Sequence, residues 1–440
     1  MSAKPRATAS KFRRQPVARH GALTSPNPFV QLLTIAGAIL AVVVVSVSAI
    51  GGFYVWDAAR ALGESGVSIG DETLPPHIGE IEGGVNMLVV GTDSCEGQDL
   101  ALFPRCKKDD GGERNDVTML LHISDEPRRV TVVSFPRDMI VPIPSCENPE
   151  TGGSYSAMSA QMINASYMYG GLGCTVSTVE ELTGVDVQFA ASIRWTGVIN
   201  MSDAIGGVDV CVSDDISDTH TGLNLAAGQH TLVGAEALQF LRIRHGIGDG
   251  SDLGRISNQQ QFMGSLVRKL QSTATLSNYP ALINLANTAV RQVNEGQLTL
   301  SESLTNPQRM AQIAMAVADV PYEDIVFVQY PTTYAPGGGR VLPVSSAADV
   351  LFTALEENKA IRVTGNASGG NGVEVVGEAG DGATGETPAP TATESPDGEA
   401  GETPDVTSTP APTASGDAVE LPSEINGQSA NQVTCTVAER

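Results

Sequence analysis

Three apolar segments that follow one another closely constrain the fold of this chain most strongly. They cover residues 86–93, 114–123 and 130–138, and each is rich in β-branched residues and of strand length. Their apolar character is nearly continuous, which indicates strands that are covered on both faces. If the three run as an antiparallel meander, the end of the first, the start of the second and the end of the third meet at one edge of the sheet.

Charged residues stand at these three strand ends. Asp93 ends the first segment, Asp116 begins the second and Arg137 ends the third. Each residue alone is more commonly a strand end that pairs at the surface. Because meander geometry brings the three together, we predict a site for a metal ion and a phosphate at this edge.

The charges of the chain are unevenly distributed. The formal net charge is −24, which argues against nucleic acid as a partner. Residues 1–28 are basic, and residues 29–56 are apolar, dominated by Leu, Ile, Ala and Val, with no charged residue between Arg19 and Asp57. About 20 apolar residues suffice to cross a bilayer. We therefore predict a single transmembrane helix at 29–56 in the cell membrane, with a cytoplasmic N-terminus and an extracytoplasmic remainder.

A cleaved signal peptide is the alternative interpretation of this segment. The apolar core of a signal peptide is normally about 7–15 residues long, which is shorter than the segment observed. A weak candidate cleavage site is Val47-Ser-Ala49. The sequence thus favours an uncleaved anchor.

The cysteine content agrees with an extracytoplasmic location. The six cysteines are Cys95, Cys106, Cys146, Cys174, Cys211 and Cys435. An even number without metal-ligand spacing indicates disulfides in an oxidising compartment, and six cysteines allow about 15 pairings. Pairing neighbours along the chain gives 95 with 106 and 146 with 174, and leaves 211 with 435 as the remainder.

The rest of the chain divides into three parts. Residues 57–82 are predicted to be an extracytoplasmic stalk. Strands and helices alternate over residues 83–360, which predicts an α/β fold: one catalytic domain with a mixed central β-sheet flanked by helices. Residues 361–440 are acidic, rich in Pro, Thr and Gly, and free of aromatic residues. Such a segment buries too little apolar surface to offset the entropy of ordering, so we predict a disordered tail.

Apolar periodicity and capping residues locate the elements within these parts. Helices are predicted over residues 159–169, 176–183, 198–205, 235–241, 252–271, 279–295, 308–317 and 345–357, and further strands over 189–195, 208–212 and 325–330.

Arginines are concentrated near predicted strand and helix ends, although the chain is acidic. They are Arg114, Arg137, Arg242, Arg244 and Arg255. Guanidinium groups bind pyrophosphate through paired hydrogen bonds, and helix N-termini favour anions. A single arginine is more often solvated or paired, but the five together predict a site for a multiply anionic ligand.

No motif for an activated nucleophile competes with this interpretation. The sequence contains no GxSxG, no P-loop and no HExxH. His122 lies in an apolar strand and is expected to be a core histidine, whereas the role of His245 stays open. Direct phosphoryl transfer needs no such nucleophile, because positioning and charge neutralisation provide most of the catalysis.

A set of motifs over about residues 84–357 resembles those of the LytR–CpsA–Psr family, in the same order. The motifs are Asn86–Ser94, Arg114–Asp116, Ser134–Asp138, Ile163–Gly171, Ile205–Val210, Gly228–Leu232, Arg242–Arg244 and Gly250–Arg255. Three positions depart from residues that are frequent in the family: Cys95 and Asn258 replace an arginine, and Met162 replaces a lysine.

The resemblance implies an enzyme that moves a glycopolymer, with its linking phosphate, from a polyprenyl-pyrophosphate carrier to a peptidoglycan hydroxyl. It also implies a mixed sheet flanked by helices and a deep apolar pocket for the prenyl chain. By motif matching, Asp93 and Asp116 are the implied ligands of Mg²⁺ (or Mn²⁺). The implied pyrophosphate-binding residues are Arg114, Arg137, Arg242, Arg244, Arg255 and Gln259.

In the expected reaction the peptidoglycan hydroxyl attacks the sugar-side phosphorus and releases polyprenyl phosphate. Asp138 or a metal-bound group is expected to accept the proton. The expected catalytic residues are Arg114, Arg137, Asp138, Arg242 and Arg244.

Two other functions stay open. A pyrophosphohydrolase would cleave the same intermediates with water. A non-catalytic regulatory or attenuator protein of the cell envelope is disfavoured by the predicted topology and by the negative charge. The sequence does not identify the glycopolymer.

Overall fold

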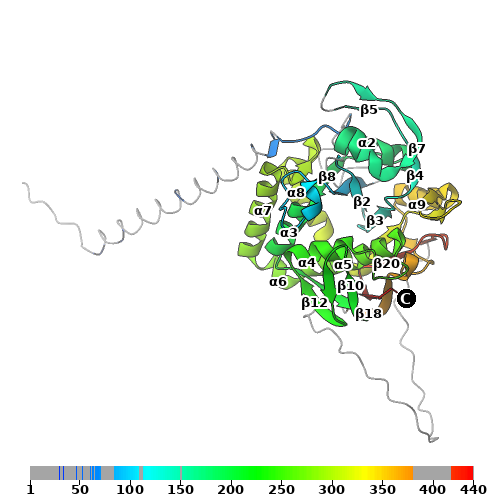
Figure 1. The fold of residues 1–440 in the computed structure, drawn as a ribbon. Coiled ribbons are helices and arrows are strands. Elements are labelled where there is room, and N and C mark those ends of the chain that lie inside the picture. Colours follow the sequence, from blue (N-terminus) through cyan, green and yellow to red (C-terminus); the bar gives the residue numbers. More distant parts are fainter. Residues whose placement is uncertain are drawn as a thin grey trace, which may run out of the picture. The chain divides into compact units, whose positions relative to one another are not determined.

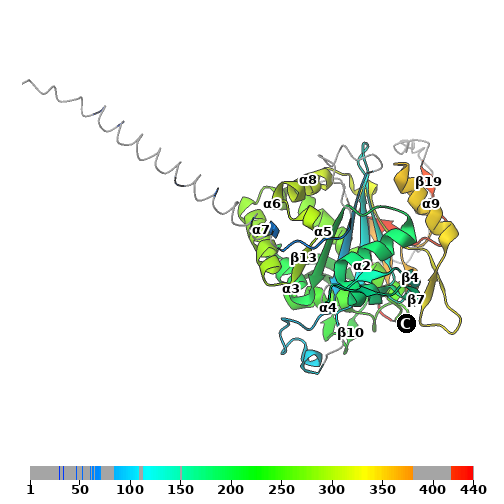
Figure 2. The same ribbon diagram turned by 90° about the horizontal axis from the view of Figure 1, so that it is seen from above.

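The computed structural model describes residues 84–108, 112–148, 151–379 and 418–439, together with residues 65–70 and a few separate positions between 29 and 63. Residues 58–440 form one structural unit, and the elements below belong to it. Figures 1 and 2 show its ribbon in two views.

The predicted meander is confirmed. β1 (Val85–Thr92), β2 (Asn115–Ile123) and β3 (Val130–Phe135) are neighbouring antiparallel strands. Alternate residues of β1 enter opposite cores: Leu88 lies in the core on one face and Val85 in the core on the other. Burial on both faces explains why these segments are almost continuously apolar.

The meander is the centre of a seven-stranded mixed sheet. Its strand order is β13-β8-β1-β2-β3-β14-β20. β8 (Phe189–Arg194) runs parallel to β1, and β14 (Ile325–Gln329) runs parallel to β3. β13 (Leu298–Leu300) and β20 (Gly427–Ser429) are antiparallel edge strands. The predicted α/β class with a mixed central sheet is therefore confirmed.

Helices cover both faces of this sheet (Figure 2). α2 (Ser166–Thr183) and α9 (Ser345–Glu356) pack on one face. α7 (Tyr279–Asn294) and α8 (Pro307–Ala318) contribute to the core on the other face, together with α5 (Asp252–Gln271). The apolar stripes of these helices are thus buried as their periodicity predicts.

A second, four-stranded sheet packs against α5 with the order β12-β9-β21-β18. Its strands are β12 (Gly228–Leu232), β9 (Val208–Val212), β21 (Gln432–Thr436) and β18 (Val373–Glu378). α5 therefore lies between two sheets, and most of its first half is buried. As predicted, Ser251 caps it: its hydroxyl accepts a hydrogen bond from the Gly254 amide.

The remaining elements are short. The helices are α3 (Trp195–Ala204), α4 (Gly234–Arg242), α6 (Thr273–Leu276) and the 3₁₀ turns η2 (Pro104–Lys107), η3 (Ile163–Ala165), η4 (Glu302–Leu304), η5 (Tyr322–Asp324) and η6 (Gly369–Asn371). The strands are β4 (Ile140–Ile143), β5 (Cys146–Glu147), β6 (Ser154–Tyr155), β7 (Met158–Met162), β10 (Ile216–Asp218), β11 (Leu223–Leu225), β15 (Thr332–Tyr334), β16 (Val341–Pro343), β17 (Ile361–Arg362) and β19 (Val419–Glu420).

The helix predicted over residues 159–169 is wrong in its first half. Residues up to Met162 pair with β4 as strand β7, and the α-helix begins only at Ser166. Strand pairing supplied by the tertiary structure overrides the local helical spacing here.

The predicted boundaries of the domain are also wrong at both ends. Leu62 and Ile69, placed in the stalk of residues 57–82, are buried in the two cores. The tail predicted over residues 361–440 forms strands at both of its ends, while residues 380–417 lie outside the description. Strands that extend an existing sheet gain backbone hydrogen bonds without needing many apolar side chains, so composition alone is a poor guide there.

None of the helices in the described part of the chain combines the length and apolarity that crossing a membrane requires. The predicted span at residues 29–56 lies outside the described residues, except for a few separate positions.

The structure contains three disulfides, and they are the three pairs predicted from the order of the cysteines along the chain. They join Cys95 to Cys106, Cys146 to Cys174 and Cys211 to Cys435. The third joins residues 224 positions apart and attaches β21 to β9. Cross-links between distant positions restrict the unfolded chain most, so this disulfide is the one that matters most for holding the C-terminal strands.

His122 is a core histidine, as predicted. Its Nδ1 lies 2.9 Å from Asn86 Oδ1, and the Asn86 amide nitrogen donates to the Asp186 carbonyl. Asn86 Oδ1 is thus the acceptor, and His122 Nδ1 carries the proton. Burial lowers the pKa of His122 to about 4, so the ring is neutral near neutral pH.

We predict that His122 makes the folded state less stable in acid. Below the usual histidine pKa the unfolded chain binds a proton that the folded chain excludes, so stability falls as pH drops from 6.5 towards 4. The contribution is about 2 kcal/mol between about pH 7 and about pH 4.5. Urea unfolding of wild type and His122→Gln at both pH values measures it, and an equal loss of stability in the two proteins would contradict the prediction.

Candidate functional site

The edge of the central sheet where β1 ends and β2 begins carries Asp93 and Asp116. The register of the two strands shifts here, because Gly91 lies opposite Val117 whereas Thr92 lies opposite Asn115. Asp116 is therefore the extra residue of a β-bulge, a feature that commonly redirects a side chain beside a functional site. Asp93 Oδ1 accepts the Arg114 amide at 2.9 Å, which fixes the Asp93 carboxylate at the same edge.

Arg137, which follows the end of β3, lies among three carboxylates. Its Nη1 is 2.7 Å from Asp116 Oδ1, and its Nε is 3.6 Å from both Asp138 Oδ1 and Asp252 Oδ1. Its backbone amide also donates to Asp252 Oδ2 at 3.0 Å. The three charges predicted from the meander thus gather at one edge, where Arg137 pairs directly with Asp116.

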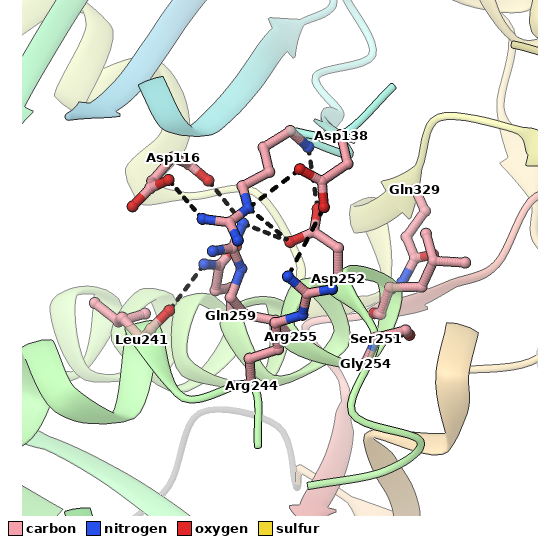
Figure 3. A network of polar contacts seen from close by, with 12 residues as sticks. Asp116, Asp138, Leu241, Arg244, Ser251, Asp252, Gly254, Arg255, Gln259 and Gln329 are labelled. Atoms are coloured by element: carbon pink, nitrogen blue, oxygen red, sulfur yellow. Dashed lines mark hydrogen bonds and ion pairs between the residues drawn. The ribbon is translucent and has the colours of Figure 1, made fainter. Parts of the chain in front are cut away.

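The N-terminus of α5 supplies the next layer of this network (Figure 3). Arg255 Nη2 lies 2.6 Å from Asp252 Oδ1 and donates to the Asp116 carbonyl at 2.8 Å. The Arg255 side chain is only 5 % exposed. The buried guanidinium group of Arg255 thereby joins helix α5 to strand β2.

Arg244 and Asp138 lie at the more open side of the network. Arg244 Nη1 is 3.9 Å from Asp138 Oδ2, and its Nε donates to the Gly250 carbonyl at 3.0 Å. These contacts leave the guanidinium group of Arg244 partly exposed. It is therefore the arginine of this network that an incoming anion reaches with the smallest rearrangement.

The network gives Asp116 and Asp138 opposite acid–base properties. Burial by itself raises the pKa of Asp116, but Arg255 and Arg137 outweigh it and leave the pKa below its usual value. Burial and the neighbouring Asp252 carboxylate raise the pKa of Asp138 above its usual value, although Arg137 and Arg244 act in the opposite direction. Asp116 thus stays ionised, and Asp138 is the better proton acceptor of the two.

The other predicted site residues lie around this centre. Arg242 stacks over the Trp195 ring at 4.1 Å, and its charge still lowers the pKa of Asp116. Arg114 is exposed. Gln259 is buried, and its side-chain amide donates to the Leu241 carbonyl at 2.9 Å. Gln259 therefore positions the end of α4, which carries Arg242. His245, whose role stayed open, is exposed and lies against His220 with ring centroids 4.4 Å apart.

Sequence reasoning missed Asp252, which contacts both Arg137 and Arg255. Its signal was the spacing of Asp252 and Arg255, three residues apart in the first turns of a predicted helix. It also missed Arg194 at the end of β8, whose guanidinium group donates two hydrogen bonds to the Glu113 carboxylate. No local sequence pattern pairs Arg194 with Glu113.

Two of the positions that depart from the family motifs have structural roles. Cys95 forms the disulfide with Cys106. The Asn258 side chain donates to the Phe240 carbonyl at 2.8 Å and accepts from the Thr436 hydroxyl at 2.6 Å. Asn258 thus connects α4 to the C-terminal strand β21.

The magnesium site expected at Asp93 and Asp116 stays a prediction. Among the described residues no three His, Cys, Asp or Glu side chains are grouped to bind a metal by themselves. Mg²⁺ is, however, usually held by one or two carboxylates together with substrate phosphate oxygens. Asp93 and Asp116 at adjoining strand ends provide such a donor pair.

The apolar pocket expected for a prenyl chain stays a prediction. A cavity of about 30 Å³ is lined by His122, Arg129 and Asp324. His122 lies at the far end of β2 from Asp116, about 20 Å away at strand spacing. This cavity has both polar and apolar lining residues, has room for about one water molecule, and is separate from the arginine cluster.

Comparison with known proteins identifies a matching family and several relatives. The profile of the LytR_cpsA_psr family matches residues 65–349. The cell wall biosynthesis protein LcpA of Corynebacterium glutamicum is 31 % identical over 266 residues, which are 56 % of this chain and 51 % of that protein. A protein of Bacillus mycoides named polyisoprenyl-teichoic acid–peptidoglycan teichoic acid transferase TagU is 31 % identical over 174 residues, which are 39 % of this chain and 53 % of that protein.

A solved structure of a LytR-Csp2A-Psr enzyme from Actinomyces oris is 23 % identical, with a TM-score of 0.49, and the match covers 66 % of this chain and 96 % of that one. The chain spans about half the length of LcpA and TagU.

Proposed function

Because the chain belongs to the LytR–CpsA–Psr family, we propose that it transfers a glycopolymer, with its linking phosphate, from a polyprenyl-pyrophosphate carrier to a peptidoglycan hydroxyl. The name of the Bacillus mycoides relative supports this reaction class, since it describes transfer of teichoic acid to peptidoglycan. The observation that carries the proposal is the convergence of Arg137, Arg244 and Arg255 on the carboxylates at one sheet edge.

The proposed reaction forms one bond to phosphorus and breaks another. The acceptor hydroxyl oxygen attacks the phosphorus on the sugar side, and the bond from that phosphorus to the bridging oxygen breaks. The bridging oxygen leaves with polyprenyl phosphate. Arg137 and Arg244 hold the phosphate oxygens and stabilise the charge that the leaving group gains.

Asp138 accepts the proton of the attacking hydroxyl in this proposal. Its raised pKa supports the assignment, because a general base works best when its pKa lies nearer the working pH. Asp116 serves a different purpose, since its lowered pKa keeps it anionic.

We further propose that Asp93 and Asp116 hold Mg²⁺ (or Mn²⁺). When bound, the cation neutralises charge on the pyrophosphate. The anchor predicted at residues 29–56 would keep the domain at the outer membrane face, where a lipid-linked donor is available, and an apolar pocket would hold the prenyl chain.

Arg244 provides the first test. We predict that Arg244→Ala lowers transfer at least about 100-fold, because it removes a partly exposed donor to the pyrophosphate. The thermal midpoint should stay within about 2 °C, because the side chain is at the surface. Transfer is measured with synthetic polyprenyl-pyrophosphate donors of varied glycan, with and without Mg²⁺. Wild-type turnover in the variant would refute the role, and release of free polymer phosphate by the wild type would favour a hydrolase.

A further inference from the structure

The loop between α4 and α5, residues 243–251, carries Arg244 and leads directly into Asp252 and Arg255. It contains three glycines with positive φ: Gly246, Gly248 and Gly250. Glycine at such positions permits the sharp course of the loop, but it also gives the unfolded loop much freedom. The position of Arg244 therefore depends on what the loop is packed against.

The C-terminal residues hold the middle of this loop. Gly248 donates to the Val437 carbonyl at 3.0 Å, and Glu439 donates to the Gly246 carbonyl at 3.0 Å. The Glu439 carboxylate in turn accepts the Gly246 amide at 2.8 Å. Both backbone groups of Gly246 are thus bound by a single residue, and Gly246 is two positions from Arg244.

A glycine-rich turn holds the other end of the loop and the start of α5. The Asp249 amide donates to the Gly370 carbonyl at 2.9 Å. A Cβ added at Gly372 would lie 2.3 Å from the carbonyl oxygen of Gly254, so the two backbones are in direct contact. Gly254 lies between Asp252 and Arg255, the buried pair of the site.

The two holding segments are joined to each other and to the body of the fold. The Val437 amide donates to the Gly372 carbonyl at 3.0 Å, and β18 and β21 are antiparallel neighbours. Cys435 is bonded to Cys211 of β9. This disulfide gives the pair of segments a fixed support on which the loop can rest.

We propose that residues 369–372 and 435–439, together called the C-terminal clamp, are part of the pyrophosphate site, and that Glu439 is a positioning residue for Arg244. The proposal rests on the proposed function. Both segments lie beyond residue 349, where the match to the family ends. The clamp contributes geometry and no group that reacts: it fixes the loop backbone from which Arg244 reaches Asp138.

Glu439 variants test the proposal in the full chain. Glu439→Ala should raise KM for the donor and the Kd for farnesyl pyrophosphate about five- to tenfold, the effect of losing one hydrogen bond to a charged group. kcat should change less, because the arginines themselves remain. Glu439→Gln should restore both constants, since its amide oxygen can still accept the Gly246 amide. A merely structural role predicts no such split between KM and kcat.

Substitutions of two glycines, one in the clamp and one outside it, provide a second test. Gly372→Ala should raise the Kd for farnesyl pyrophosphate about tenfold, because the added methyl group pushes on Gly254 and displaces the start of α5. Gly377→Ala on strand β18 is the matched control, since a Cβ there meets nothing within 4 Å. Circular dichroism identifies any variant that does not fold. If Gly372→Ala does not fold, the Glu439 variants alone test the proposal.

The outcomes separate the two proposals. If the wild-type chain neither binds farnesyl pyrophosphate nor transfers glycopolymer, the proposed function fails. If the wild type binds and transfers, but Glu439→Ala matches it in KM and Kd, the clamp is refuted and the function stands.

Discussion

Arg137→Ala is expected to transfer glycopolymer about 1,000-fold more slowly than the wild type, the upper range for losing one charged donor at a reacting centre. Arg137 touches Asp116, Asp138 and Asp252. Without its guanidinium group, less positive charge offsets the negative charges of these three carboxylates and of the incoming pyrophosphate. Repulsion of the anionic substrate then adds to the lost transition-state contact.

The same substitution should change the pH dependence of transfer. Arg137 lowers the pKa of Asp138, which burial and Asp252 raise. Its removal raises that pKa further, so the acid limb of the pH–rate profile should move to higher pH in Arg137→Ala. An unchanged limb would show that Asp138 is not the group that accepts the proton.

Two controls define the Arg137 experiment. Arg137→Lys keeps the charge but not the planar fork, and should recover only part of the rate. Arg362→Ala removes an exposed arginine that pairs with Glu420 away from the site, and should transfer at the wild-type rate. Equal transfer rates for Arg137→Ala and Arg362→Ala would show that Arg137 is not part of the site.

Asp252→Ala is expected to destabilise the fold by about 3–5 kcal/mol, the usual cost of removing one partner of a buried ion pair. Its carboxylate lies between Arg255 and Arg137, and the side chain is only 8 % exposed. The substitution leaves the Arg255 guanidinium group buried without its nearest anion. Urea unfolding at neutral pH measures the loss.

The control for this experiment is Asp319→Ala, at the exposed end of α8, which should change stability by less than about 0.5 kcal/mol. The double variant Asp252→Ala with Arg255→Met should be less destabilised than the sum of the single variants, because the unpaired charge is then absent. Additive effects would mean that the pair is not coupled.

Local patterns were sufficient for much of the fold. Continuous apolar segments identified β1 to β3, and Ser251 marked the start of α5. The disulfide between Cys95 and Cys106 also follows from the sequence, because closing a short loop costs little entropy. Pairing Cys211 with Cys435 followed only as a remainder.

The sequence predicted the meeting of charged strand ends better than it predicted the partner of each individual side chain. Asp116 and Arg137 were expected to meet because a meander places their strand ends together, and they form an ion pair. Gln259 was assigned to the pyrophosphate, yet its amide is bound to the backbone of α4. A side chain that shares a helix face with a site residue can still be used by a neighbouring element.

What the sequence by itself determined was the meander of β1, β2 and β3 and the gathering of charges at one edge of their sheet. Each depends on residues close together in the chain, or on the strict alternation of a strand. Only the tertiary structure decided that Asp252 links Arg137 to Arg255, and that residues near 370 and 438 support the loop of Arg244. The contact of Asp252 with Arg137 and the contacts of the Arg244 loop join residues more than 100 positions apart. They leave no local pattern, because a backbone hydrogen bond is open to almost any residue.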